Sequence, residues 1–319
     1  MAERYETVAV ELEFAAPLLD PDTLIESDDW YLRGKIDALA IDHNTGDLLI
    51  VEHKTSSSDI SPGSDYWRRL RLDSQISMYF DGARALGYQP TGIVYDVLAK
   101  PNLRLGGPTK KRAEAETLDE FRERFRAAIA DNPNGTYARS RLVRFDTEID
   151  EARRDVWATA RQLDQAMRLG EYPRNPGACW KYNSMCEFFA VCSGEATLDD
   201  PNLFHRREGH SELSATDDTR PALTNSRISL ARECQRAHLY RYIEGYETTA
   251  RRPALAFGTL VHLGLEHWWS ATGDRLEAAI EAMRGAEVEP IDLVRAEELL
   301  AGYDVRWAEH HPTAAHRAA

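Results

Sequence analysis

The sequence has 319 residues, of which 43% are hydrophobic, so the chain can bury a substantial core as one large domain or two smaller ones. Its formal net charge of −14 argues against a protein that coats nucleic acid through bulk electrostatic attraction. No stretch approaches the ~20 apolar residues of a membrane span, and charges stand near the N-terminus where a signal peptide needs an apolar run. We therefore expect a globular, cytoplasmic protein with no membrane partner.

The first half of the chain predicts strands followed by helices. Residues 5–14 and 30–42 alternate apolar and polar side chains, and the turn "DHNTGD" leads into the short apolar run "LLIV". These three segments predict an antiparallel meander. Residues 66–87 have helical spacing up to a glycine, and residues 91–99 predict a further strand. Helices at 114–131 and 147–170, with a short strand at 140–145 between them, complete this half.

The second half predicts a linker and then a helical segment. Residues 195–225 are polar, lack periodicity and contain many Asp, Ser, Thr and Pro, as linkers do. Helices are expected at 226–244, 257–271, 274–285 and near 292–309. The expected organisation is therefore a core with a cysteine-bearing segment over 1–194, a linker over 195–225, and a helical segment over 226–319.

An acidic and a basic side chain follow the apolar run at 48–51. Glu52 and Lys54 are two residues apart, so they project from one face of a strand. Asp37 in "GKID" can lie beside Glu52 on the neighbouring strand, and two adjacent carboxylates favour a hard cation such as Mg²⁺ or Mn²⁺. A lysine beside that cation can orient a water or help to deprotonate it for attack on a phosphate. The alternative is an exposed edge strand with ordinary ion pairs.

Polar and basic residues mark the helix predicted at 66–87. Gln75 and Tyr79 are four apart and share a face, where they could hold a nucleic-acid backbone or the lysine. Arg68, Arg69 and Arg71 flank this pair and could contact DNA phosphates. The alternative is a solvated helix surface.

Four cysteines form a possible metal site. Cys179, Cys186 and Cys192 lie close together in the sequence, and Cys234 lies in the C-terminal segment. Four thiolates can bind zinc or an iron–sulfur cluster, and their spacing does not separate the two metals. Buried, inert thiols are the alternative, because aromatic and apolar residues surround the three clustered cysteines.

These motifs together resemble the PD-(D/E)XK nuclease superfamily, specifically its RecB-like branch. The matching residues are Asp37 in "GKID", Glu52 and Lys54 in "EHKT", and Gln75 and Tyr79 in "QISMY". The resemblance implies an α/β, restriction-endonuclease-like core of three-stranded meander, helix and strand. It also implies that Asp37, Glu52 and the main-chain carbonyl of His53 bind Mg²⁺ or Mn²⁺, while Lys54 positions the attacking water.

The resemblance extends to the cysteines and the C-terminal segment. RecB-like nucleases of the iron–sulfur type have three C-terminal cysteines and one near the start of the domain, which implies a 4Fe-4S cluster here, with zinc as the alternative. The histidine of their Gly-x-x-x-His helix is a metal ligand, which implies the same role for His262 in "GTLVH". Because Cys234 and His262 follow the core instead of preceding it, we expect a circularly permuted chain. The alternative is that the two segments belong to different nuclease copies.

The expected function is that of a metal-dependent DNA nuclease. The resemblance favours an exonuclease of phage or bacterial DNA processing and recombination, which hydrolyses phosphodiester bonds in single strands or at duplex ends. A helicase or recombinase is a conceivable partner. The alternative is a non-catalytic DNA-binding or scaffold protein with a structural zinc site.

Overall fold

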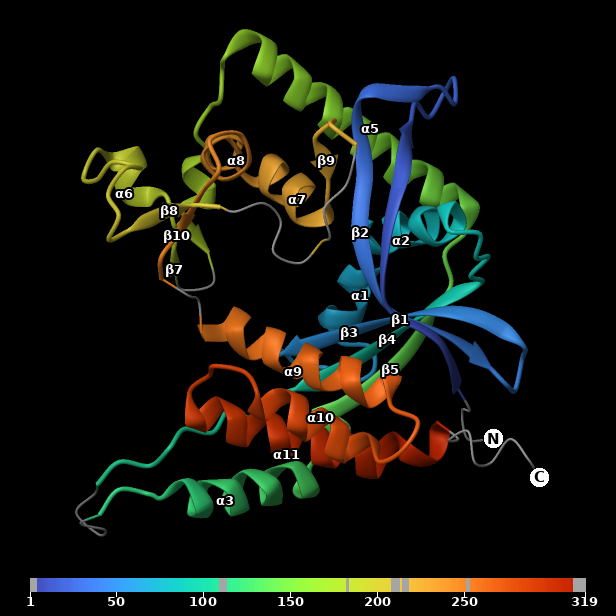
Figure 1. Ribbon diagram of the computed structural model, residues 1–319, viewed down its shortest axis with the longest axis vertical. Helices are drawn as coiled ribbons and strands as arrows, with labels where there is room; N and C mark the ends of the chain where they lie inside the picture. The colour runs from blue at the N-terminus through green and yellow to red at the C-terminus, as the bar shows by residue number, and fades with distance from the viewer. Residues whose placement is uncertain are drawn as a thin grey trace.

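A mixed sheet forms the centre of the computed structural model, which describes residues 5–108, 114–181, 184–207, 213, 218–250 and 253–311 (Figure 1). Three long strands form an antiparallel meander: β1 (Tyr5–Leu19), β2 (Glu26–Asp42) and β3 (Asp47–Ser56). Next in the sheet come β4 (Gly92–Ala99), parallel to β3, and β5 (Tyr137–Leu142), antiparallel to β4. The predicted α/β class and the predicted order of meander, helix and strand are confirmed.

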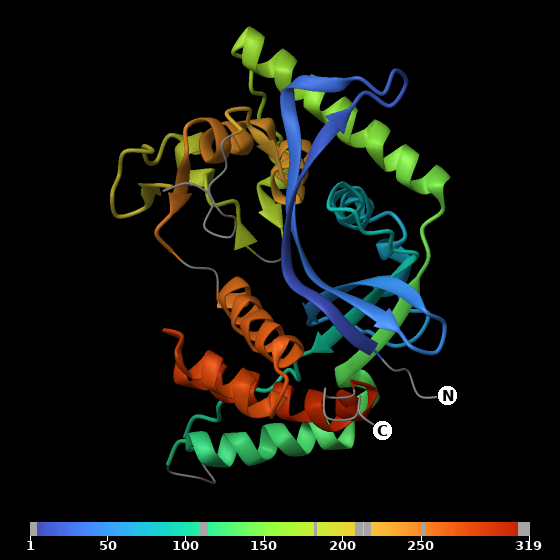
Figure 2. The ribbon, with the colours of Figure 1, turned by 45° about the vertical axis from the view of Figure 1, so that its right-hand side comes forward.

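Helices cover both faces of this sheet (Figure 2). On one face, α2 (Ser74–Ala85) and α5 (Asp146–Leu169) pack on Phe14, Ile36 and Ile50. On the other face, four helices pack on Leu49 and Val51: α3 (Leu118–Asp131), α9 (Pro253–Ser270), α10 (Arg275–Arg284) and α11 (Pro290–Trp307). Because β3 is buried on both faces, its apolar residues run continuously instead of alternating.

The helix predicted at 66–87 is wrong in one respect, because the structure divides it. The two pieces are α1 (Asp65–Leu70) and α2. The Asp73 side chain accepts a hydrogen bond from the backbone N–H of Gln75 at 2.9 Å, which caps the start of α2. At the break, the Arg144 guanidinium donates to the carbonyls of Leu70 and Asp73, each at 3.0 Å. Arg144 therefore binds the free carbonyls at the end of α1, and Asp73 caps the start of α2.

The helix predicted at 226–244 is also interrupted. Its pieces are α7 (Asn225–Glu233), α8 (Gln235–His238) and a π-helical turn over Leu239–Ile243. Cys234 separates the first two pieces, because its backbone is extended (φ −159°, ψ 112°). The helices predicted further on correspond to α9, α10 and α11, and a 3₁₀ turn over Ala308–His310 follows them.

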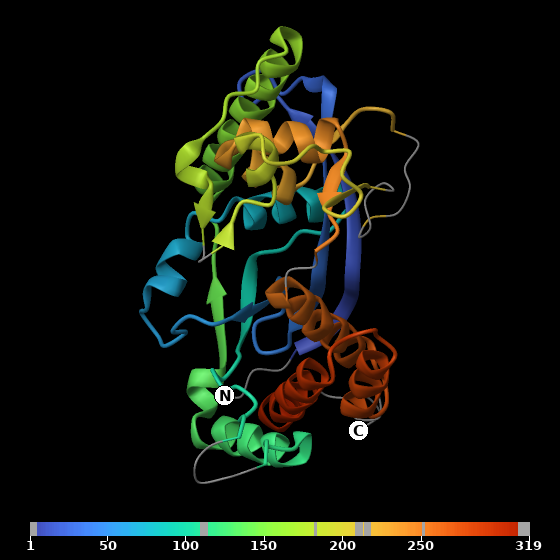
Figure 3. The same cartoon turned by 90° about the vertical axis from the view of Figure 1, so that its left-hand side faces the viewer.

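A small cysteine lobe packs beside α7, in the half of the molecule away from α3 and α11 (Figure 3). We use this name for residues 173–181, 184–207 and 234–248, which include α8 and surround an apolar cluster containing Phe188, Phe204 and Tyr240. Its elements are the 3₁₀ turn Pro176–Ala178, the hairpin β6 (Trp180–Lys181) and β7 (Ser184–Met185), α6 (Phe189–Ser193), and the pair β8 (Phe204–Arg206) and β10 (Tyr246–Thr248).

The segment predicted as a linker, 195–225, contains some regular structure. It includes β8 of the cysteine lobe and β9 (Ala222–Leu223), which pairs in parallel with β2. Residues 208–212 and 214–217 of this segment lie outside the described residues. A last short helix, α4 (Pro133–Thr136), joins α3 to β5.

The first and last described residues of the chain lie next to each other. The rings of Tyr5 and His311 have centroids 5.6 Å apart. Among the described residues, none of the helices is both long enough and apolar enough to cross a lipid bilayer.

Candidate active site

Asp37 and Glu52 lie side by side on neighbouring strands. Ala38 of β2 pairs with Val51 of β3, so Asp37 and Glu52 are the next opposed positions along this antiparallel pair. The Asp37 carboxylate also accepts a hydrogen bond from the backbone N–H of His53 at 2.7 Å. Both acids line a cavity of about 740 Å³, which we call the central cavity. The structure therefore brings these two carboxylates together at one cavity.

Burial makes this pair of acids unfavourable when both are ionised. Glu52 is 1% exposed, and its Oε2 is buried without a hydrogen-bond partner among the described residues. Burial, followed by the charge of Asp37, raises the pKa of Glu52 to about 7. Burial likewise raises the pKa of Asp37 above its usual range. A divalent cation would relieve both effects, because it stabilises the two ionised carboxylates.

Lys54 completes the group and is held from α2. Its ammonium forms an ion pair with Glu52 and donates to Oε1 of Gln75 at 2.9 Å. The Gln75 amide in turn donates to the Tyr79 hydroxyl at 2.6 Å. Although burial by itself lowers the pKa of Lys54, the charges of Glu52 and Asp37 outweigh it and raise that pKa above its usual value. Lys54 is therefore a charged group that Gln75 fixes in place.

Two glycines allow α2 to approach the sheet closely enough for these contacts. The Phe14 ring of β1 lies against Gly34 of β2 and Gly82 of α2, and neither position has room for a Cβ atom. The ring thus fills the space between the helix and the hairpin, which sets the distance from Gln75 to Lys54.

His262 reaches the same cavity from the C-terminal segment. It lies on α9, with Nδ1 3.8 Å from Oδ2 of Asp37. The helix packs closely on β3, since a Cβ at Gly258 would lie 3.4 Å from Oγ1 of Thr55. Glu266, one turn beyond His262, also lines the cavity. The two halves of the sequence therefore contribute to one cavity within a single chain.

The His53 side chain points away from the two acids, into a buried polar network. Its Nδ1 is 3.6 Å from Oδ2 of Asp96, and its ring centroid is 5.3 Å from that of Trp269. Asp96 is paired with Arg139 at 2.8 Å and accepts a hydrogen bond from Tyr303. Nothing in the local sequence pattern indicates this network, because its members come from β3, β4, β5 and α11.

The donors in the cavity suit a hard cation, although they do not surround one point in the structure. Among the described ranges, no three His, Cys, Asp or Glu side chains are grouped so as to hold a metal ion. Glu52 is turned to Lys54, and Asp37 to the His53 amide. Two carboxylates, one of which has an unpartnered oxygen (Oε2 of Glu52), and an imidazole are nevertheless the donor chemistry that Mg²⁺ or Mn²⁺ accepts.

The four cysteines gather in the cysteine lobe. The Cys186 N–H donates to the carbonyl of Cys179 at 2.8 Å, and Cys186, Cys192 and Cys234 pack against one apolar cluster. Burial raises the pKa of the Cys186 and Cys192 thiols, and the thiols of Cys179 and Cys234 add to this effect. All four thiols are thus near one another, but within the described part of the chain they do not form a closed metal-binding group.

The three arginines predicted to bind DNA lie outside the central cavity as the described residues define it. Arg68 pairs with Asp65 at 3.2 Å, and the Arg69 guanidinium lies 4.8 Å from the centroid of the Tyr66 ring. Instead, Arg33 and Lys35 of β2 line the cavity together with Lys54. The sequence contained a signal for this: residues 33, 35 and 37 share one face of a strand.

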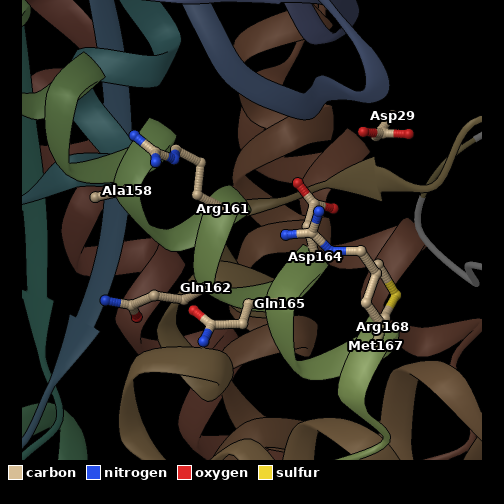
Figure 4. A pocket seen from close by; sticks show the side chains of 8 residues that line it. All are labelled: Asp29, Ala158, Arg161, Gln162, Asp164, Gln165, Met167 and Arg168. Atoms are coloured by element: carbon tan, nitrogen blue, oxygen red, sulfur yellow. The ribbon is translucent and has the colours of Figure 1, made fainter.

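A second hollow, of about 510 Å³, lies along α5 (Figure 4). Its lining consists of Asp29, Ala158, Arg161, Gln162, Asp164, Gln165, Met167 and Arg168. This lining contains none of the residues predicted for catalysis, so the central cavity is the candidate active site.

Comparison with known proteins gives one family. No curated protein matches the sequence. A sequence profile described as the PD-(D/E)XK nuclease superfamily matches residues 1–193 and 222–318, which include both the carboxylates of the hairpin and His262. The chain therefore belongs to the PD-(D/E)XK nuclease superfamily.

Proposed function

We propose that this protein is a metal-dependent deoxyribonuclease that acts as an exonuclease in DNA processing or recombination. The observation that carries the proposal is the meeting of Asp37, Glu52, Lys54 and His262 at one cavity. Membership of the nuclease superfamily supports hydrolysis of phosphodiester bonds by a metal-dependent site. DNA as the substrate and the exonuclease mode are the further steps that we propose.

In this proposal the cation is bound by Asp37, Glu52, His262 and the main-chain carbonyl of His53. When bound, it supplies Lewis-acid stabilisation of the oxygens at the scissile phosphate and lowers the pKa of bound water. Lys54 orients the attacking water and offsets charge that develops on the phosphate. Without the cation, the pKa of Lys54 is raised, despite burial, by the charges of Glu52 and Asp37, so it enters the site as a charged donor suited to orienting the water. Gln75 and Tyr79 keep its ammonium at that position.

The decisive test is incubation of purified protein with end-labelled linear DNA and with closed circular DNA, in Mg²⁺, Mn²⁺ or EDTA. We expect digestion of the linear substrate only, and its loss in EDTA. Equal digestion of both substrates would show that the protein is an endonuclease and not an exonuclease, because closed circular DNA has no free end. No digestion in either metal, with DNA still bound, would identify a non-catalytic binding protein.

Cation binding should depend on pH through Glu52. A carboxyl group with a raised pKa is protonated as the pH falls, and the protonated form does not bind a metal ion. Because the pKa of Glu52 is about 7, we expect Mn²⁺ affinity to be nearly constant above about pH 8 and to fall about tenfold per pH unit well below pH 7. Calorimetric Mn²⁺ titration across this range measures the effect, and Glu52→Gln should remove most of the affinity and make the slope shallower, because protonation of the remaining ligands still opposes binding. Constant affinity down to about pH 5.5 would contradict a raised pKa at the metal site.

We further propose that Cys179, Cys186, Cys192 and Cys234 hold a 4Fe-4S cluster, with structural zinc as the alternative. Cys186, Cys192 and Cys234 pack against one apolar cluster, and Cys179 is near enough to act on the thiols of Cys186 and Cys192, which supports a shared site. Absorbance near ~400 nm after anaerobic purification would indicate iron and sulfur, whereas a colourless protein with bound zinc would select the alternative. Protein free of both metals would leave four structural thiols.

We also propose that the chain is a circular permutant of the RecB-like arrangement. Support comes from α7 and α9 packing on the core of the same chain, and from the adjacency of Tyr5 and His311. A rearranged chain, with residues 208–319 placed ahead of residues 1–207 so that β8 is kept, should fold and cleave DNA at a similar rate. An insoluble or inactive rearranged chain would argue against it.

A further inference from the structure

A row of basic residues leads along β2 to the candidate metal site. Arg33, Lys35 and Asp37 alternate along the strand and therefore share one face, and all three line the central cavity. The side chain of Lys35 is 32% exposed and that of Arg33 is 10% exposed. Both cations are thus set in the wall of the cavity and not on the open surface.

Each of these cations is paired with a glutamate from β1. Lys35 forms an ion pair with Glu11, and Arg33 pairs with Glu13 at 3.3 Å. Glu11 adds to the acidic lining that Asp37 and Glu52 already give the cavity. A polyanionic strand can approach such a lining only where cations replace its counter-ions.

Glu11 occupies an unusual backbone position. Its φ is +52° in the interior of β1, a region that side chains other than glycine rarely adopt. Its neighbours Val10 and Leu12 pair with Ala38 and Ile36, so Glu11 stands opposite Asp37. Its carboxylate is close enough to Asp37 and Glu266 to interact with both charges. The Glu11 carboxylate thus lies beside Lys35 and near Asp37, one of the proposed metal ligands.

We propose that Lys35 and Arg33 bind phosphates of the nucleic-acid strand that enters the cavity, and that Glu11 and Glu13 hold these cations until the phosphates displace them. The proposal deepens the proposed function and rests on it for the identity of the ligand. The Lys35–Glu11 pair is partly exposed, and such pairs contribute little net stability, so exchange of the Glu11 carboxylate for a phosphate is feasible. Such contacts position the strand and do not distinguish its sequence.

The test is the salt dependence of binding of a fluorescent single-stranded DNA oligonucleotide. It is measured by anisotropy in EDTA, with the oligonucleotide checked on a gel for integrity. Each phosphate contact contributes about 0.7 to the slope of log Kd against log salt for single strands. We expect Lys35→Met to reduce the slope by about that amount and to weaken binding at low salt. Arg33→Met should do the same, and the double variant should lose about twice as much.

Glu11→Gln gives a prediction of opposite sign. Loss of its charge removes the ion pair with Lys35 and one negative charge from the cavity, so the variant should bind the oligonucleotide more tightly than the wild type at low salt. If the Glu11–Lys35 pair has a purely structural role, both Glu11→Gln and Lys35→Met should bind the oligonucleotide more weakly than the wild type. Arg154→Met is the matched control. Arg154 lies on the surface of α5 and pairs with Asp22, away from the central cavity, so the salt-dependence slope of this variant should equal that of the wild type.

The outcomes separate this inference from the proposed nuclease activity. An unchanged slope in Lys35→Met, or weaker binding by Glu11→Gln, would overturn the phosphate contacts even if the wild type cleaves DNA. If the variants show the expected slopes but the wild type does not cleave DNA, the phosphate contacts are supported and the proposed nuclease activity is wrong. Thermal melting of each variant establishes that it is folded, and since Lys35 is more exposed than Arg33, its variant decides the question if Arg33→Met does not fold.

Discussion

Replacing Lys54 by methionine is expected to lower the single-turnover rate of DNA cleavage by about 10²- to 10⁴-fold, while DNA binding changes by only a few fold. The ammonium contacts both Glu52 and Gln75, so it stands where a water could be oriented next to the two acids. Methionine keeps much of the side-chain volume and removes only the charge and the donor. Cleavage of an end-labelled linear duplex in Mg²⁺, with enzyme in excess, measures the chemical step directly.

The matched control for this substitution is Lys181→Met. Lys181 is also a partly exposed lysine in an ion pair, 3.0 Å from Glu233, but it lies on the cysteine lobe. We expect it to cleave DNA at the wild-type rate. A Lys54→Met enzyme that retains more than about a tenth of wild-type activity would show that the lysine does not orient the nucleophile. Gln75→Ala should give a smaller loss, because Lys54 would keep its ion pair with Glu52.

Arg139→Met is expected to lower the free energy of unfolding by about 3–5 kcal/mol, the largest stability effect that we predict. The side chains of Arg139 and Asp96 are 2% and 1% exposed, and removal of one leaves the other as an unpaired buried charge. Burial alone would raise the pKa of Asp96, but Arg139 and His53 more than offset it and hold that pKa below its usual range. Urea unfolding monitored by circular dichroism at pH 7 measures the difference.

Two further variants show whether the effect comes from the buried pair. Asp96→Asn in the Arg139→Met background should cost less than the sum of the two single changes, because the second substitution removes the charge left unpaired. Arg154→Met, which disrupts an exposed pair with Asp22, should change stability by less than about 1 kcal/mol. If Arg139→Met lowers the free energy of unfolding by less than about 1 kcal/mol, water or a rearranged side chain must stabilise the buried charge of Asp96.

The buried pair also connects stability to the candidate active site. Asp96 contacts His53 on one side and Tyr303 of α11 on the other. Arg139 of β5 lies 4.3 Å from the centroid of the Trp307 ring near the end of α11. The network therefore fixes the C-terminal helix to the strand that carries Glu52 and Lys54. The same C-terminal segment places His262 in the cavity.

The sequence alone determined the parts of the site that depend on local geometry. Side chains two apart on a strand share a face, so the spacing of Glu52 and Lys54 is sufficient to assign both to one surface. The apolar run that precedes them had to be buried, and the turn after β2 required an antiparallel neighbour, which placed Asp37 beside Glu52. Helical spacing in the same way joined Gln75 to Tyr79.

Only the tertiary structure decided the features that depend on contacts between distant segments. The break between α1 and α2 depends on carbonyl contacts from Arg144, and the roles of Arg33 and Lys35 depend on glutamates of another strand. The Asp96–Arg139 pair leaves no local pattern, because a buried charge is stable only beside a partner that folding brings to it. His262 reaches Asp37 for the same reason: helix periodicity fixes the face on which a residue lies, and packing decides what that face contacts.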